Sequence, residues 1–191
     1  MKILEERILK EGRVLDHNIL KVDRFLNHQL DVELLSEIGK AFYEMFKEEK
    51  ITKILTAEVS GIAIATMTGF HFKVPVLFAK KTESLNLDKE TYEGSVYSFT
   101  KQKHYKIRVS KNYLQKEDRI LIVDDFLANG EAIKGLKEIV DASGATLVAA
   151  GVAIEKCFQE GGRKLRENGM DVRALASIES IEKGKIIFKQ K

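Results

Sequence analysis

The sequence contains little cysteine and proline and no tryptophan. Its single cysteine, Cys157, has no partner for an internal disulfide, and no set of Cys and His residues has the spacing of a metal site. The only proline is Pro75, and neither a repeat nor an obvious linker interrupts the chain. We therefore expect the 191 residues, 44% of which are hydrophobic, to fold as one domain around a sizeable core.

Long apolar runs are also missing. No stretch approaches the roughly 20 apolar residues that span a bilayer, and the first residues, MKILEERILKEG, carry charges throughout. The 32 Lys and Arg and the 29 Asp and Glu are intermixed, which leaves a net charge of +3 and no basic arm. These features predict a cytoplasmic protein that binds neither membrane nor nucleic acid. A mildly basic chain is still compatible with a small polyanionic substrate.

Apolar patterning predicts strands that alternate with helices. Helices are expected over residues 1–12, 31–50, 61–70, 131–144 and 163–169. Buried strands are expected over residues 53–61, 74–80, 118–125, 145–156 and 172–181. Continuously apolar strands separated by helices are typical of an α/β fold, with a mostly parallel twisted sheet flanked by helices.

Residues 82–112 differ from this pattern because they are polar and rich in lysine. Apolar side chains alternate with polar neighbours here, which favours a mobile β-hairpin or lid over an element of the core. These apolar residues are Val96, Tyr97, Phe99, Tyr105, Ile107 and Val109.

The segment ILIVDDFLANGEAIKGL, residues 120–136, carries the chemistry. A hydrophobic strand delivers Asp124 and Asp125 to its carboxyl end, where open α/β sheets bind ligands. Gly130 then marks a tight turn into a helix, and the unpaired N–H groups at residues 128–132 form a ready anion site. Two carboxylates beside a phosphate cradle match ribose 5-phosphate, which has cis hydroxyls at one end and a phosphate at the other.

This order of strand, acid pair, turn and helix resembles the phosphoribosyl pyrophosphate (PRPP) motif of the type I phosphoribosyltransferases. The resemblance implies that Asp124 and Asp125 are the catalytic acids. It also implies that PRPP is bound by Ala128, Asn129, Gly130, Glu131 and Ala132. Asn129 stands where the family usually has Thr, and Glu131, placed where small residues are commoner, must point outward or be offset by the helix dipole. The less favoured alternative is an ordinary buried strand followed by two capping acids.

Two further segments are similar to parts of this family. TAEVSGIAIA, residues 56–65, resembles the loop that binds pyrophosphate through backbone amides, with Ser60 in its lining, although Ser-Gly before an apolar helix is commonly only a turn. Residues 82–112 lie where the family has its catalytic lid. Lys80 and Lys81, at the entrance to that segment, either meet pyrophosphate oxygens or are simply solvated.

The base site of the family is built by a variable hood and by the loop after the strand that follows the phosphate helix. In that loop, EKCFQEGGR, Lys156 would donate to an exocyclic oxygen, which favours an oxopurine over adenine. The run VLDHNILKVDRFLNHQL resembles the hood of bacterial xanthine phosphoribosyltransferases, and by position Leu20 and Asn27 would contact the base. Asn27 would donate to the second carbonyl of xanthine, or it only caps a turn.

The resemblance extends over nearly the whole chain. It implies one domain, residues 1–191, with a core over about 31–155, a hood over about 1–30 and 156–191, and a lid over about 82–112. It implies conversion of xanthine and PRPP to xanthosine 5'-monophosphate and pyrophosphate, with Mg²⁺ that accompanies the pyrophosphate and is not held by the protein alone.

The same resemblance implies a homodimer, which the sequence supports only loosely through the apolar residues Phe70, Phe72 and Val74. Two alternatives to the xanthine enzyme stay open. One is transfer to adenine or to hypoxanthine and guanine. The other is a non-catalytic regulator that binds PRPP as a signal, although the chain has no room before residue 30 for an added DNA-binding domain.

Overall fold

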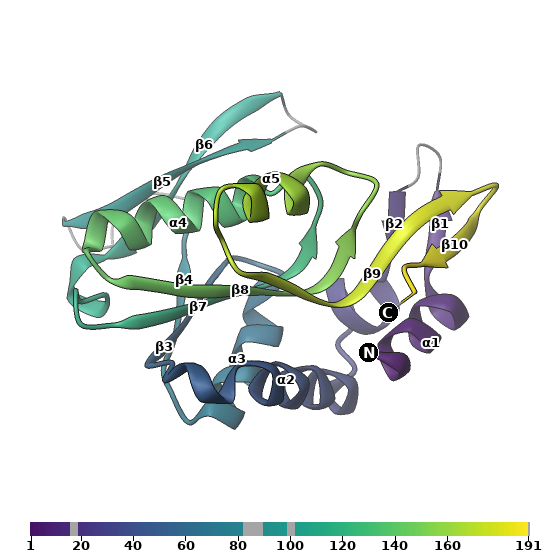
Figure 1. The fold of residues 1–191 in the computed structure, drawn as a ribbon, viewed down its shortest axis with the longest axis horizontal. Helices are drawn as coiled ribbons and strands as arrows, with labels where there is room; N and C mark the ends of the chain where they lie inside the picture. The colour runs from purple at the N-terminus through teal and green to yellow at the C-terminus, as the bar shows by residue number, and fades with distance from the viewer. Residues whose placement is uncertain (16–18, 82–89, 99–101, 191) are drawn as a thin grey trace.

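A six-stranded sheet forms the centre of the protein (Figure 1). The computed structural model describes residues 1–15, 19–81, 90–98 and 102–190. The strand order is β10-β9-β8-β7-β3-β4, in which β10 alone is antiparallel to its neighbour. The strands are β3 (Lys53–Ala57), β4 (Val76–Ala79), β7 (Arg119–Leu127), β8 (Thr146–Lys156), β9 (Val172–Glu182) and β10 (Lys185–Phe188). The predicted α/β class with a mostly parallel sheet is confirmed.

Helices cover both faces of this sheet (Figure 1). One face carries α2 (Val32–Phe46) and α3 (Gly61–Phe72), and the other carries α4 (Glu131–Ser143) and α5 (Gly161–Glu167). None of the helices in the described ranges has the length and apolar character needed to cross a membrane.

Side chains that alternate along β7 explain the two helical layers. Leu121 and Val123 belong to the apolar cluster under α2 and α3, whereas Ile120 and Ile122 belong to the cluster under α4. All four side chains are fully buried. The strand is therefore apolar on both sides, as a sheet between two layers of helices requires.

Local signals set the ends of α2 and α4. The Asp31 carboxylate accepts a hydrogen bond from the Leu34 N–H at 3.0 Å and so caps α2. Helix α2 ends at Phe46, earlier than predicted, and a 3₁₀ turn over Lys47–Glu49 follows it. Helix α4 ends at Ser143, and Gly144, which has a left-handed φ of 74°, follows as its C-cap.

The described residues of the first 30 lie beside the sheet (Figure 1), and we call them the N-terminal hood segment. This segment contains α1 (Lys2–Glu11), the antiparallel pair β1 (Arg13–Leu15) and β2 (Ile19–Lys21), and a π-helical turn, η2 (Asp23–Asn27). Strand β10, which was not predicted, pairs with the end of β9 close to this segment. The boundaries of core, hood and lid remain a prediction.

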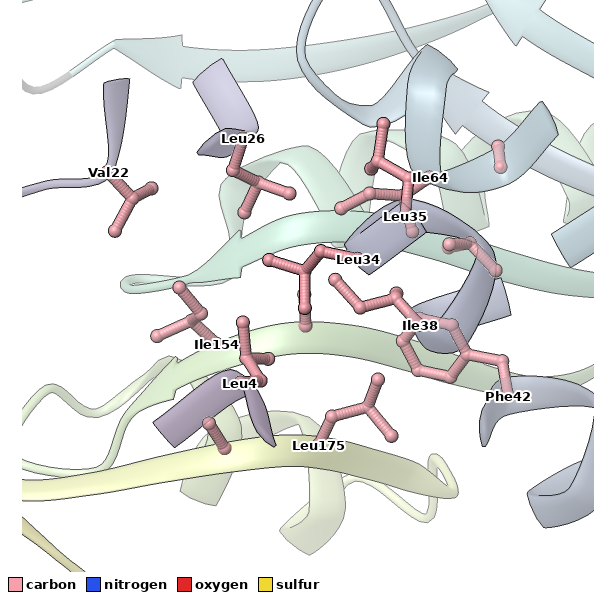
Figure 2. Packing of buried hydrophobic residues seen from close by; sticks show 14 of the residues in the cluster. Leu4, Val22, Leu26, Leu34, Leu35, Ile38, Phe42, Ile64, Ile154 and Leu175 are labelled. Carbon is pink, nitrogen blue, oxygen red and sulfur yellow. The ribbon is translucent and has the colours of Figure 1, made fainter. Parts of the chain in front are cut away.

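The hood segment and the sheet share one apolar core. Figure 2 shows side chains from the hood segment, α2, α3, β8 and β9 gathered in a single cluster. Its labelled members include Leu4, Val22, Leu26, Leu34, Ile64, Ile154 and Leu175. Since the cluster is continuous, the hood segment is held to the sheet by buried apolar surface.

A second antiparallel pair, β5 (Thr91–Ser98) and β6 (Lys103–Ser110), lies over α4 (Figure 1). The predicted hairpin is thus confirmed for the described part of residues 82–112, while residues 82–89 and 99–101 lie outside the described residues.

The expectation that this hairpin stays out of the core is wrong. Val96, Ile107 and Val109 are at most 3% exposed and pack in the same cluster as α4. Strand and helix approach so closely that a Cβ on Gly94 would lie 2.0 Å from the carbonyl oxygen of Gly135. Glycine at both positions therefore brings the hairpin backbone onto the helix.

Candidate functional site

The acid pair lies near the carboxyl end of β7 and lines one cavity. Asp124 is 7% exposed, and its Oδ1 accepts a hydrogen bond from the Asp125 N–H at 3.0 Å. Asp125 Oδ1 accepts from the Phe126 N–H at 2.9 Å, and its Oδ2 accepts from Asn27 Nδ2 at 2.7 Å. Burial first, and then the negative charge of Asp125, raise the pKa of Asp124 well above its ordinary value, while Lys81 opposes the shift.

This acid cavity has a volume of about 500 Å³ and is bounded on one side by the loop between β3 and α3. Ser60 and Gly61 of that loop line it together with both acids. A Cβ on Gly61 would lie 2.1 Å from Thr56 Oγ1 and 3.0 Å from Asp124 Oδ1. Helix α3 can therefore begin against the acid pair only because residue 61 is glycine.

Lys81 also lines the acid cavity, whereas Lys80 does not. The Lys81 N–H donates to the Glu58 carboxylate at 2.5 Å, and its Nζ lies 5.6 Å from the centre of the Tyr105 ring. Lys80 Nζ instead lies 6.0 Å from the ring of Phe78. The structure thus brings Ser60 and Lys81 together with the acids, and their roles toward a ligand remain predictions.

The turn before α4 lines a second cavity, the helix cavity, of about 360 Å³. Its lining includes the five predicted residues Ala128, Asn129, Gly130, Glu131 and Ala132. Gly130 has a left-handed φ of 80°, which turns the chain from β7 into α4. The first N–H groups of this 13-residue helix have no partners within the helix, so they are available to an anion.

Glu131 is paired within its own helix. Its carboxylate accepts a hydrogen bond from Lys134 Nζ at 2.6 Å, one turn further along α4. The positive charge of Lys134 therefore offsets the negative charge that Glu131 brings to the helix cavity. This ion pair was not predicted; only the helix dipole and an outward orientation were expected to offset the charge of Glu131.

The two cavities adjoin, because they share the lining residues Val96, Tyr105, Phe126 and Ala132. Together they form one continuous cleft from the acid pair to the start of α4, bordered by the β5–β6 hairpin. Tyr105 is partly buried, and this burial, followed by the charge of Asp124, raises the pKa of its hydroxyl. No role was predicted for Tyr105, although its alternation with Ile107 and Val109 places it on the apolar side of β6.

The residues predicted for base recognition lie in three different environments. Lys156, the last residue of β8, lines the helix cavity with its Nζ 5.6 Å from the centre of the Phe126 ring, and burial lowers its pKa. Asn27 bonds to Asp125. Leu20 is 5% exposed within the core of the hood segment and lines neither cavity.

Gln159 is a further lining residue of the helix cavity that the sequence analysis missed. Its Oε1 is buried and has no hydrogen-bond partner among the described residues. The only signal for Gln159 in the sequence is its position, three residues after Lys156 in the same loop. The amide is therefore a second polar group on the Lys156 side of the cleft.

A buried ion pair fixes the strand end that carries Lys156. Glu155 is 4% exposed, and both of its carboxylate oxygens accept hydrogen bonds from Arg166 of α5, each at 2.7 Å. The Arg166 Nε also donates to the Val172 carbonyl at 3.0 Å. Since Glu155 and Lys156 are neighbours on a strand, their side chains point to opposite sides, and the ion pair leaves Lys156 directed to the cleft.

The donor set of the cleft fits Mg²⁺ that arrives with a phosphorylated substrate. Among the described residues, no group of three or more His, Cys, Asp or Glu is placed to hold a metal ion. The carboxylates of Asp124 and Asp125 are nevertheless of the kind that Mg²⁺ uses, because this ion commonly takes one or two carboxylates and completes its shell with water and substrate phosphates.

Several solved structures with this fold are adenine phosphoribosyltransferases. The enzyme from Rhodothermus marinus matches with a TM-score of 0.76 and 21% identity, over 93% of this chain and 100% of that one. The Giardia lamblia APRTase matches with a TM-score of 0.78 and 17% identity, over 93% and 98%. At these identities the likeness shows the fold alone, and it confirms the type I phosphoribosyltransferase fold.

Curated relatives are much more similar in sequence. A xanthine phosphoribosyltransferase from Ruminiclostridium cellulolyticum is 58% identical over 190 residues, which cover all of both chains. Those from Alkaliphilus metalliredigens and Clostridioides difficile are 57% and 54% identical, and each match covers 99% of this chain and at least 94% of the relative. No family model matches the chain. With such identity over its full length, the chain belongs to the xanthine phosphoribosyltransferase family.

Proposed function

We propose that the protein transfers the phosphoribosyl group of PRPP to xanthine and thereby forms xanthosine 5'-monophosphate and pyrophosphate. The observation that carries this proposal is the continuous cleft, in which two carboxylates lie beside a helix N-terminus. The curated xanthine phosphoribosyltransferases, similar over their whole length, support the choice of base. In the reaction, the bond from ribose C1 to the pyrophosphate oxygen breaks and a bond from C1 to a ring nitrogen of the base forms.

The acid pair would hold the ribose. Positive charge develops on the sugar as its bond to pyrophosphate breaks, as in other substitutions at an anomeric carbon. Asp125 is already oriented by two hydrogen bonds, from Phe126 and Asn27, so its carboxylate would meet the ribose hydroxyls without further ordering.

The start of α4 would hold the 5'-phosphate. Backbone N–H groups and the positive end of the helix dipole favour an anion there, and Lys134 reduces repulsion from Glu131. Ser60 and Lys81 would lie near the departing pyrophosphate on the other side of the acids. Bound Mg²⁺, held by Asp124, Asp125 and substrate oxygens, would neutralise charge on the leaving pyrophosphate.

Lys156 would read the base. Its ammonium is a donor without an acceptor function, so it matches a carbonyl oxygen and not the amino group of adenine. Partial burial removes competing water and so strengthens such a hydrogen bond. The proton lost from the base nitrogen passes to solvent, and no residue of the cleft is assigned as a general base.

We also propose that the protein is a homodimer in the cytoplasm. Of the three apolar residues named for pairing, Phe72 and Val74 pack against the core, whereas Phe70 is 72% exposed. Val59, in the loop that lines the acid cavity, is 74% exposed and would be covered by a second copy. Light scattering that gives the mass of a monomer, at a concentration with full activity, would contradict the dimer.

The function is tested by incubating the protein with PRPP, Mg²⁺ and one purine base at a time. We expect xanthosine 5'-monophosphate and pyrophosphate in equal amounts when the base is xanthine. Efficient use of adenine would contradict the base assignment but not the reaction. Binding of PRPP without any nucleotide product would instead support the alternative of a non-catalytic regulator that binds PRPP as a signal.

A further inference from the structure

Asn27 belongs to the hood segment but contacts the acid pair. It is the last residue of η2, its side chain is exposed, and its Nδ2 donates to Asp125 Oδ2 at 2.7 Å across 98 positions of sequence. In the parts of the chain that the structure describes, this is the only side-chain hydrogen bond from residues 1–30 to a residue that lines the acid cavity or the helix cavity. The contact therefore connects the hood directly to the proposed sugar site.

The contact gives the Asp125 carboxylate a second hydrogen-bond donor. One carboxylate oxygen is held by the Phe126 N–H, which belongs to the same strand and is present whatever the hood does. With that oxygen alone fixed, the carboxylate can still turn about its side-chain bonds. The second donor, from Asn27, fixes the plane of the carboxylate. Since catalysis depends on such groups being held to within a fraction of an ångström, this donor affects how Asp125 meets the ribose.

We infer that Asn27 is a positioning residue, which holds Asp125 ready for the ribose hydroxyls. The inference rests on the proposed function. An amide nitrogen has two N–H donors, and one of those on Asn27 goes to Asp125. Because this contact is present without a base, its loss should affect PRPP binding even when no base is present.

Calorimetric titration of PRPP with Mg²⁺, in the absence of base, measures this role. Loss of a hydrogen bond to a charged group weakens binding about ten- to a hundredfold, and we take the low end because Asn27 is exposed. Asn27→Ala should therefore weaken PRPP binding roughly tenfold. Gln29→Ala is the matched control, because Gln29 is an exposed side chain in the same segment, and the side-chain hydrogen bonds that Asp125 accepts come from Phe126 and Asn27. It should leave PRPP binding unchanged.

A double-mutant cycle shows whether Asn27 acts through Asp125. The Asn27→Ala and Asp125→Asn effects on PRPP affinity should be non-additive, so that the double variant binds about as weakly as Asp125→Asn alone. Additive effects would overturn the inference. So would an Asn27→Ala variant that raises only the KM for xanthine and binds PRPP as the wild type does, and the proposed function would survive both results. Failure of the proposed function itself would appear in the wild type, as absent PRPP binding or absent nucleotide.

Discussion

Replacement of Lys156 tests the base assignment. Lys156 ends β8, its ammonium lies 5.6 Å from the Phe126 ring in the helix cavity, and its partial burial lowers its pKa. A charge-assisted hydrogen bond contributes roughly 1.5–3 kcal/mol, so its loss should lower kcat/KM for xanthine about ten- to a hundredfold. Lys156→Met is the sharper change, because methionine keeps most of the length and apolar character of the lysine stem and removes the charge.

Steady-state kinetics with xanthine, guanine, hypoxanthine and adenine provide the assay. Both Lys156→Met and Lys156→Ala should lose activity on the oxopurines and keep the PRPP affinity of the wild type. Lys185→Ala, which removes an exposed lysine of β10 that lines neither cavity, should behave as the wild type. Unchanged kcat/KM for xanthine in Lys156→Met would show that Lys156 makes no hydrogen bond to the base, because the lysine would then only extend from a strand end into water.

Four further changes test other parts of the account. Asp125→Asn should fold normally yet lose activity by about 2–4 kcal/mol in the barrier, measured as kcat/KM, and wild-type turnover would remove Asp125 from the site. Asp124→Asn should raise the free energy of unfolding near neutral pH. Burial raises the pKa of this carboxyl in the folded state. Ionisation of Asp124 therefore destabilises the folded wild type above that pKa, and this destabilisation disappears as the pH falls below the pKa of the unfolded state. Denaturant unfolding at several pH values checks this sign, and equal stability of the two proteins at all pH values would contradict it. Gly94→Ala places a Cβ 2.0 Å from the backbone of α4 and should cost about 1–3 kcal/mol of stability, whereas an unchanged thermal midpoint would show that the hairpin does not rest on the helix. Arg166→Met leaves Glu155 buried without its partner and should lower the free energy of unfolding by about 2–3 kcal/mol. This is below the roughly 3–5 kcal/mol of a fully buried pair, because the Arg166 side chain is 41% exposed. A denaturation midpoint equal to that of the wild type would show that the ion pair does not stabilise the fold.

The sequence predicts the centre of the cleft because its signals are local. The apolar strand, Asp124, Asp125, Gly130 and the amphipathic helix follow one another within residues 120–136. Each step depends on neighbouring residues alone, namely on strand burial, left-handed glycine geometry and unpaired N–H groups at a helix start. The same holds for Asp31 and Gly144, which begin and end helices as predicted.

Contacts between distant segments are what the sequence does not reveal. Alternation over residues 91–110 indicates an apolar face but not the helix that covers it, since that depends on Gly94 meeting Gly135 of α4. The bond from Asn27 to Asp125 joins positions 98 residues apart, and no local pattern encodes it. β10 was missed because a four-residue edge strand is defined by its pairing with the end of β9, which the sequence of β10 alone does not reveal.

The cleft should transfer phosphoribosyl groups to xanthine in preference to adenine. Wild-type kcat/KM for the two bases, measured with PRPP and Mg²⁺ under the same conditions, decides whether it does. Because adenine offers Lys156 no acceptor, its kcat/KM should lack the contribution of one charge-assisted hydrogen bond. We therefore expect xanthine to be preferred by at least about tenfold. Equal use of both bases, or a preference for adenine, would contradict the account.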